Sequence, residues 1–156
     1  MDNEVWLDDG QQESWRGVIG LLTTLPQALE SDLRRRADLT MFDYTVLASL
    51  SEAPDRTLQM SELAYRANAS LSRLSHVVSR LEKRGWVTRE LSGSDARATN
   101  ATLTGAGWKK VVAAAPLHAQ SVRDLVVSAL TPAQLKQLGI LARKIERHIE
   151  GRTEAP

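Results

Sequence analysis

Residues 70–87 read SLSRLSHVVSRLEKRGWV, and the spacing of the apolar side chains in this stretch decides the fold. Four of them recur at steps of 3, 4 and 3 residues, which keeps them on one face of a helix with 3.6 residues per turn. They are Leu71, Leu74, Val78 and Leu81. Ser70 can cap the first turn and Gly85 can end the last, so we expect an amphipathic helix of about 15 residues.

A different face of the same helix carries polar side chains that are free to reach base edges or phosphates of a nucleic acid. They are Ser72, Arg73, His76 and Arg80, with the capping Ser70 beside them. Many solvated helices also carry serine, arginine and histidine on their outer face. This pattern alone therefore leaves two interpretations open, a DNA-reading face and an ordinary solvated surface.

Two short strands are predicted directly after this helix, at Val87–Leu91 and Ala98–Leu103, from their threonine and valine content and their partial alternation. The residues between them, Ser92, Gly93, Ser94 and Asp95, supply turn chemistry. A two-stranded ribbon after an amphipathic helix is the wing of a winged helix-turn-helix. The short helix expected at 60–67 is the first helix of that motif.

Four motifs follow one another between Ser61 and Gly107: SELA, RLEKRGWV, a wing with Asp95-x-Arg97, and LTGAG. With these motifs the chain resembles the MarR (multiple antibiotic resistance regulator) family of bacterial transcription factors. The resemblance implies a mainly α fold with a small two- or three-stranded β wing, in which N- and C-terminal dimerisation helices flank a winged helix-turn-helix. It also implies a homodimer that binds double-stranded DNA at a pseudo-palindromic operator, most often as a repressor.

Two positions depart from the pattern of that family. The wing reads Asp95-Ala96-Arg97 where the family more often has Asp-Arg-Arg, and the helix reads Ser75-His76 where the family has Thr-Arg. These differences bear on which operator sequence the chain prefers, not on its fold or on DNA binding as such. The resemblance implies that Arg97 enters the minor groove, and Asp95 is expected to position the tip of the wing. The expected DNA-binding residues of the wing are Arg89, Ser94, Asp95 and Arg97.

Positive charge is concentrated on the predicted reading segment. Residues 56–110 hold ten basic and four acidic side chains, a net charge of +6 in a chain whose total is +1. A surface of this sign matches the phosphate backbone, because neutralising phosphates releases their condensed counterions.

Other classes of function find little support in the sequence. The chain has no cysteine, which excludes disulfides, thiolate zinc sites and cysteine redox switches. Its three histidines fall on separate predicted helices without an HxH or HExxH spacing. We therefore expect no enzyme and no cofactor, and only a histidine–carboxylate metal site assembled across helices stays open. Without a membrane-length apolar run or a signal-peptide layout, a cytoplasmic protein with no membrane partner is expected.

Apolar stripes with alternating steps of 3 and 4 residues occur near both ends of the chain. The first consists of Trp15, Val18, Leu22, Leu25 and Leu29, and the second of Leu135, Leu138, Ala142, Ile145 and Ile149. Such spacing is typical of a helix–helix seam, and here it predicts a homodimer. An ordinary core face within one chain is the alternative.

The expected organisation follows from these stripes and the wing. Residues 1–36 form an N-terminal dimerisation helix, 37–110 the winged helix-turn-helix and 111–156 the C-terminal dimerisation helices. We also expect a helix at 40–53 capped by Thr40 and a helix from Thr104 to about Leu130. Pro26 and Pro116 should kink the helices that contain them. The last helix should begin at Thr131, with Gln134 in a capping box.

The resemblance also implies a crevice for a small aromatic or phenolic effector, between the dimerisation helices and the winged helix. Its candidate lining residues are Trp15, Met41, Tyr44 and Trp108, and the alternative for each of them is an ordinary place in the core. The sequence thus predicts a homodimeric, sequence-specific transcriptional regulator, a repressor relieved by a small-molecule effector. A winged-helix protein-interaction module without operator specificity is the alternative.

Overall fold

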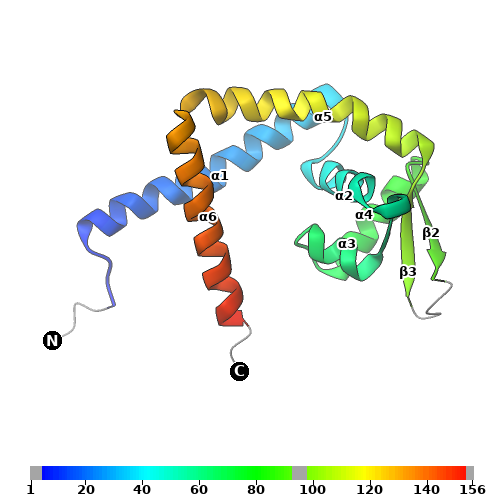
Figure 1. Cartoon of the computed structure of the whole chain (residues 1–156), viewed down its shortest axis with the longest axis horizontal. Helices are drawn as coiled ribbons and strands as arrows, with labels where there is room; N and C mark the ends of the chain where they lie inside the picture. The colour runs from blue at the N-terminus through cyan, green and yellow to red at the C-terminus, as the bar shows by residue number, and fades with distance from the viewer. Residues whose placement is uncertain (1–4, 93–97, 154–156) are drawn as a thin grey trace. The chain divides into compact units, whose positions relative to one another are not determined.

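The computed structural model describes residues 5–92 and 98–153, which form helices and one antiparallel sheet (Figure 1). The expected class, mainly α with a small β wing, is confirmed. The elements are α1 (Asp9–Ala37), α2 (Met41–Glu52), η1 (Pro54–Arg56), β1 (Thr57–Gln59), α3 (Met60–Arg66), α4 (Leu71–Lys83), β2 (Val87–Leu91), β3 (Thr99–Leu103), α5 (Gly105–Leu125), η2 (Val127–Ala129) and α6 (Pro132–Thr153).

The sheet has the strand order β1-β3-β2, and both neighbouring pairs are antiparallel. The β2–β3 ribbon is the wing, with Val87 opposite Leu103 at its base and Leu91 opposite Thr99 at its described end. The third strand, β1, joins the ribbon's other edge through the pair Thr57–Thr102. The sheet therefore ties the segment before the helix-turn-helix to the wing that follows it.

Helix α4 buries one face in the core and begins and ends as the sequence predicts. The Ser70 hydroxyl accepts a hydrogen bond from the Arg73 amide, and Gly85 has the left-handed φ of 71° that lets the chain turn away. Its buried residues are Leu74, Val77, Val78 and Leu81. The prediction that Leu71 belongs to this face is wrong, because Leu71 is 54% exposed. It occupies the first helical position, one turn before the buried set begins, and Val77 completes that set instead.

The core of the winged helix-turn-helix collects side chains from α2, α3, α4, the sheet and the first half of α5. Its largest fully buried members include Leu47, Leu50, Leu63, Leu74 and Leu81. In Figure 1 the helices α2, α3 and α4 lie together beside β2 and β3. Burial of each such side chain contributes about 1.5–3 kcal/mol to the free energy of unfolding. This core is therefore the main source of order for the winged helix-turn-helix, which we call the reading head.

The start of α5 explains the LTGAG motif. Thr104 accepts a hydrogen bond from the Gly107 amide and donates one to the Gly85 carbonyl, so it caps α5 and fixes the end of α4. A Cβ added to Gly107 would lie 2.1 Å from the Trp86 carbonyl oxygen and 2.6 Å from Leu103 Cδ1. Only glycine allows α5 to approach the start of β2 this closely.

The chain divides into two compact units, residues 1–118 and 119–156. In the second unit α6 starts as expected, because the Thr131 hydroxyl accepts from the Gln134 amide and the Gln134 side chain accepts from the Thr131 amide. Helix α5 ends at Leu125, earlier than expected, and η2 follows it. Pro26 and Pro116 lie inside continuous helices, so neither proline ends its helix. The division into reading and dimerisation segments stays a prediction.

The two end helices expose much of their apolar surface. On α1 the stripe is exposed at Trp15, Val18 and Leu22, and it enters the core only at Leu29. On α6 the stripe is exposed at Leu138 and Ile145. Within the described residues no single helix is long and apolar enough to cross a membrane, and only α5 and α6 taken together as a bent pair reach the required length and apolarity.

The close approach at Gly107 gives a direct test of the fold. Gly107→Ala should lower the free energy of unfolding by about 1–3 kcal/mol, because the added methyl overlaps a backbone carbonyl that cannot move freely. Gly105→Ala is the matched control, since nothing lies within 4 Å of its Cβ position and it has an ordinary helical environment. Urea unfolding of both variants measures the difference, and equal stabilities would contradict the packing described.

Candidate nucleic-acid interface

Helix α4 is the second helix of the helix-turn-helix, the recognition helix, and its first two turns present the polar face that the sequence predicts. Ser72, Arg73 and His76 are exposed, and the capping Ser70 is exposed just before them. Ser72 and His76 lie opposite the buried set that begins at Leu74, and Arg73 lies at its edge beside α2. Packing of that set therefore fixes the direction in which they project. The N-terminal part of such a helix is the part that meets base edges in helix-turn-helix proteins.

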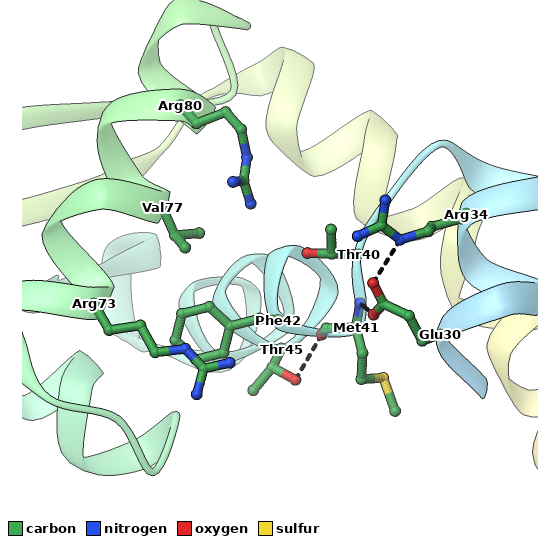
Figure 2. Close-up of a pocket in the computed structure, with 9 residues that line it drawn as sticks. All are labelled: Glu30, Arg34, Thr40, Met41, Phe42, Thr45, Arg73, Val77 and Arg80. Atoms are coloured by element: carbon green, nitrogen blue, oxygen red, sulfur yellow. Dashed lines mark hydrogen bonds and ion pairs between the residues drawn. The ribbon is translucent and has the colours of Figure 1, made fainter. Parts of the chain in front are cut away.

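Arg73 is positioned by an aromatic ring. Its guanidinium carbon lies 4.4 Å from the centroid of the Phe42 ring, which comes from the first turn of α2. Figure 2 shows the guanidinium of Arg73 next to this ring. A cation over an aromatic face is attracted by the ring quadrupole, by about 0.5–1 kcal/mol at an exposed site. The contact limits the rotamers of Arg73 but leaves its donors exposed.

Arg80 differs from its expected role. The sequence predicts it among the free donors of the polar face, but the structure pairs its Nη2 with Asp43 Oδ1 of α2 at 2.5 Å. The Asp43 side chain is only 6% exposed. A carboxylate buried to this degree requires a partner, and α4 places Arg80 within its reach. Arg80 is thus paired with Asp43 while its side chain stays 49% exposed, and its contact with DNA stays a prediction.

Arg89 is also engaged within the protein. Its Nε donates to Glu82 Oε2 at 2.8 Å and its Nη2 donates to Ser79 Oγ at 3.0 Å, so strand β2 is bound to the recognition helix. The sequence predicts Arg89 as a DNA contact, and the structure places its guanidinium against α4. Ser94, Asp95 and Arg97 lie outside the described residues, so their roles stay predictions.

The far end of α4 is bound to the junction between α1 and α2. Arg84 Nη2 lies 3.2 Å from Asp38 Oδ2, and Arg84 Nη1 donates to the Asp38 carbonyl at 3.0 Å. Asp38 has a left-handed φ of 48° and ends α1. Asp38, Phe42, Asp43 and Arg84 are therefore site residues that the sequence analysis missed. The Thr40–Asp43 capping box is readable from the sequence, but the contacts to α4 are not local.

A cavity of about 480 Å³ lies between the end of α1, the start of α2 and α4 (Figure 2). It combines charged side chains with an apolar wall. Its lining residues are Glu30, Arg34, Thr40, Met41, Phe42, Thr45, Arg73, Val77 and Arg80. On its α1 side, Glu30 accepts hydrogen bonds from the Met41 amide and from Arg34 Nε.

Only one of the four residues predicted for an effector crevice lines this cavity, namely Met41. Trp15 lies in an open hollow on α1 with Leu7 and Val18. Tyr44 contacts His118 at a ring separation of 4.7 Å, and Trp108 lies beneath the guanidinium of Arg56 at 4.0 Å. The structure thus does not bring these four side chains together.

Two pKa shifts occur where α2 meets α5. Burial lowers the pKa of His118 from its usual 6.5. Burial, followed by the charge of Glu52, raises the pKa of Tyr44 from its usual 10.0. The Nδ1 atom of His118 is buried and has no hydrogen-bond partner among the described residues. Both rings are therefore held neutral near pH 7.

Residues 39–99 match the family model described as MarR family. A MarR family transcriptional regulator from Streptomyces coelicolor, solved in complex with DNA, is 42% identical, with a TM-score of 0.89 and coverage of 92% of this chain and 94% of that one. The chain belongs to the MarR family. AbsC, a second MarR family regulator from Streptomyces coelicolor, is 38% identical, with a TM-score of 0.88 and coverage of 94% and 98%.

The transcriptional repressor MprA of Escherichia coli is a more distant relative of this MarR family chain. The two are 28% identical over 102 residues, which is 65% of this chain and 57% of MprA. The match thus spans little more than half of that relative's length. Family membership places the chain among DNA-binding transcriptional regulators, which are not enzymes. Across residues 5–92 and 98–153 no three metal-ligating side chains come together.

The environment of His118 predicts a pH-dependent stability. Because its pKa is lowered in the folded state, the unfolded chain takes up a proton first as the pH falls. The free energy of unfolding therefore has its full value above pH 6.5. It decreases as the pH falls from there through the lower folded-state pKa of His118. His118→Phe keeps a ring against Tyr44 and removes the titration, so its urea midpoint should vary less between about pH 7.5 and 5.5. His148→Phe is the control, and an equal pH dependence in His118→Phe and the wild type would contradict this assignment.

Proposed function

We propose that this chain is a homodimeric, sequence-specific transcriptional repressor that acts in the cytoplasm and is relieved by a small-molecule effector. The observation that carries the proposal is the exposed first half of α4, where Ser72, Arg73 and His76 project from a rigidly packed helix. A relative with 42% identity over nearly the whole chain was solved in complex with DNA.

The proposed reading mode follows from the position of each group on α4. Ser72, Arg73 and His76 would meet base edges in the major groove, because they lie in the first two turns. Arg73 has a planar guanidinium that can donate two parallel hydrogen bonds to a guanine, and Phe42 limits the directions in which it points. In the wing, Arg97 would enter the minor groove while Asp95 positions the tip, and Ser94 would contact DNA beside them.

A homodimer is supported by the apolar surface that the end helices leave exposed. Trp15 and Leu22 on α1, and Leu138 and Ile145 on α6, are exposed in the single chain. Large apolar side chains repeated along one helix face favour burial against another surface. A two-fold dimer carries two reading heads, and these match an operator whose two half-sites form a pseudo-palindrome.

The cavity in Figure 2 is the proposed effector site. Phe42, Met41 and Val77 supply apolar walls and Arg34 supplies a cation, which suits a small aromatic or phenolic ligand. A ring bound against Phe42 would compete with the guanidinium of Arg73 for the same surface. Occupation of the cavity would then move a side chain that the proposed repressor uses to read DNA.

Selection of bound sequences from a random duplex pool tests the proposal. We expect an enriched inverted repeat with half-site centres about 10–10.5 base pairs apart, because each subunit reads one turn of the duplex. Arg73→Ala should then cost about 1–3 kcal/mol on the selected duplex and far less on random duplex. The matched control is Arg35→Ala, which removes the same charge from an exposed position on α1.

Three outcomes would contradict parts of this proposal. A pool without an enriched motif would favour the protein-interaction module, and enrichment of an isolated half-site would contradict the dimer. Equal losses of Arg73→Ala on selected and random duplex would show that Arg73 contacts phosphate and not a base.

A further inference from the structure

We propose that Asp43 and Arg80 form a positioning pair, which sets the orientation of the recognition helix for sequence reading, and that Arg80 does not contact DNA itself. The inference rests on the proposed function. The polar face of α4 suggests that Arg80 donates hydrogen bonds to DNA. We propose instead that it acts through its contact with Asp43.

The carboxylate of Asp43 is shared between two elements. Its Oδ2 accepts a hydrogen bond from the Thr40 amide at 3.0 Å, which completes the capping box at the start of α2. Its Oδ1 accepts a hydrogen bond from Arg80 Nη2. Since the side chain is 6% exposed, both oxygens are held by protein groups and hardly at all by water. The start of α2 and the middle of α4 are thereby fixed to the same buried group.

A second contact lies two turns away on the same side of α4. Arg73 and Arg80 are seven residues apart, which returns nearly to the same direction on a helix and separates the two positions by about 10 Å along its axis. Arg73 lies over Phe42 and Arg80 binds Asp43, and these partners are neighbours in the first turn of α2. Two contacts at different heights fix both the tilt of α4 and its rotation about its own axis.

Rotation of α4 is the variable that matters for reading. A helix turns by about 100° per residue, so a rotation of a fraction of that angle moves the first-turn side chains away from the base edges they would meet. The Arg84–Asp38 contact is the weaker restraint, because the Asp38 side chain is exposed to solvent. The Asp43–Arg80 pair joins a carboxylate that is only 6% exposed to an arginine that is 49% exposed, and it is therefore the contact most able to hold the rotation.

The pairing also has an electrostatic consequence. The charge of Arg80 is balanced by Asp43, so this arginine adds little to the attraction of phosphates. A positioning residue and a phosphate contact thus predict different effects on the salt dependence of binding. A phosphate contact would contribute about one unit to the slope of log affinity against log salt, whereas a positioning residue contributes none.

The test compares Asp43→Asn and Arg80→Gln on the selected duplex and on random duplex at several salt concentrations. We expect each variant to lose about tenfold in affinity for the selected duplex, with unchanged affinity for random duplex and an unchanged salt slope. The double variant should be no weaker than either single variant. Losses on both duplexes with a flatter slope for Arg80→Gln, or tighter binding by Asp43→Asn, would overturn the inference.

Two controls keep the test decisive. Asp43→Asn should fold, because an asparagine side chain retains an oxygen that can accept from the Thr40 amide. Arg80→Lys should restore part of the lost specificity, because it keeps a cation near Asp43. If Asp43→Asn unfolds, Arg80→Gln and Arg80→Lys carry the same comparison. Asp32→Asn on α1 removes an equal charge elsewhere and should leave sequence preference intact.

The failure of this inference and the failure of the proposed function give different results. A wild-type chain without sequence preference would overturn both together. Sequence preference retained in full by Asp43→Asn and Arg80→Gln would overturn the inference alone.

Discussion

The requirement that a buried carboxylate be paired governs the reading head. Asp43 satisfies it with the Thr40 amide on one side and Arg80 on the other, so the cap of α2 and the placement of α4 depend on one side chain. The apolar face of α4 then packs in a single orientation, and Arg89 binds the wing strand to the same helix through Glu82. The exposed groups on the first turns of α4 take their positions from these contacts.

The arginines of the reading segment divide into two kinds of role. Among the described residues Arg66, Arg80, Arg84 and Arg89 each form an ion pair with an aspartate or glutamate. The net charge of +6 on residues 56–110 is therefore partly used to hold elements together. Arg73 instead rests on the ring of Phe42, which leaves its donors exposed and makes it the residue of α4 best placed to read a base.

Local features of the fold could be predicted from the sequence because their causes are local. The caps at Ser70, Thr40 and Thr131, the turn at Gly85 and the wing strands all depend on neighbouring residues, and the structure contains them. The role of Arg80 could not be predicted, because its partner lies 37 residues away in the sequence. The four residues predicted for an effector crevice lie apart in the single chain, because apolar character shows that a side chain will pack but not which neighbours it will meet.

The role of the Asp43–Arg80 pair is tested most directly by a double-mutant cycle in urea unfolding, with Asp43→Asn, Arg80→Gln and the double variant. We expect the two substitutions to be coupled by about 1 kcal/mol or more, because each single variant leaves a group at the α2–α4 contact without its partner. The double variant should then be nearly as stable as the less stable single variant. Additive losses of unfolding free energy, with a coupling free energy near zero, would contradict this role and show that the pair does not hold the recognition helix.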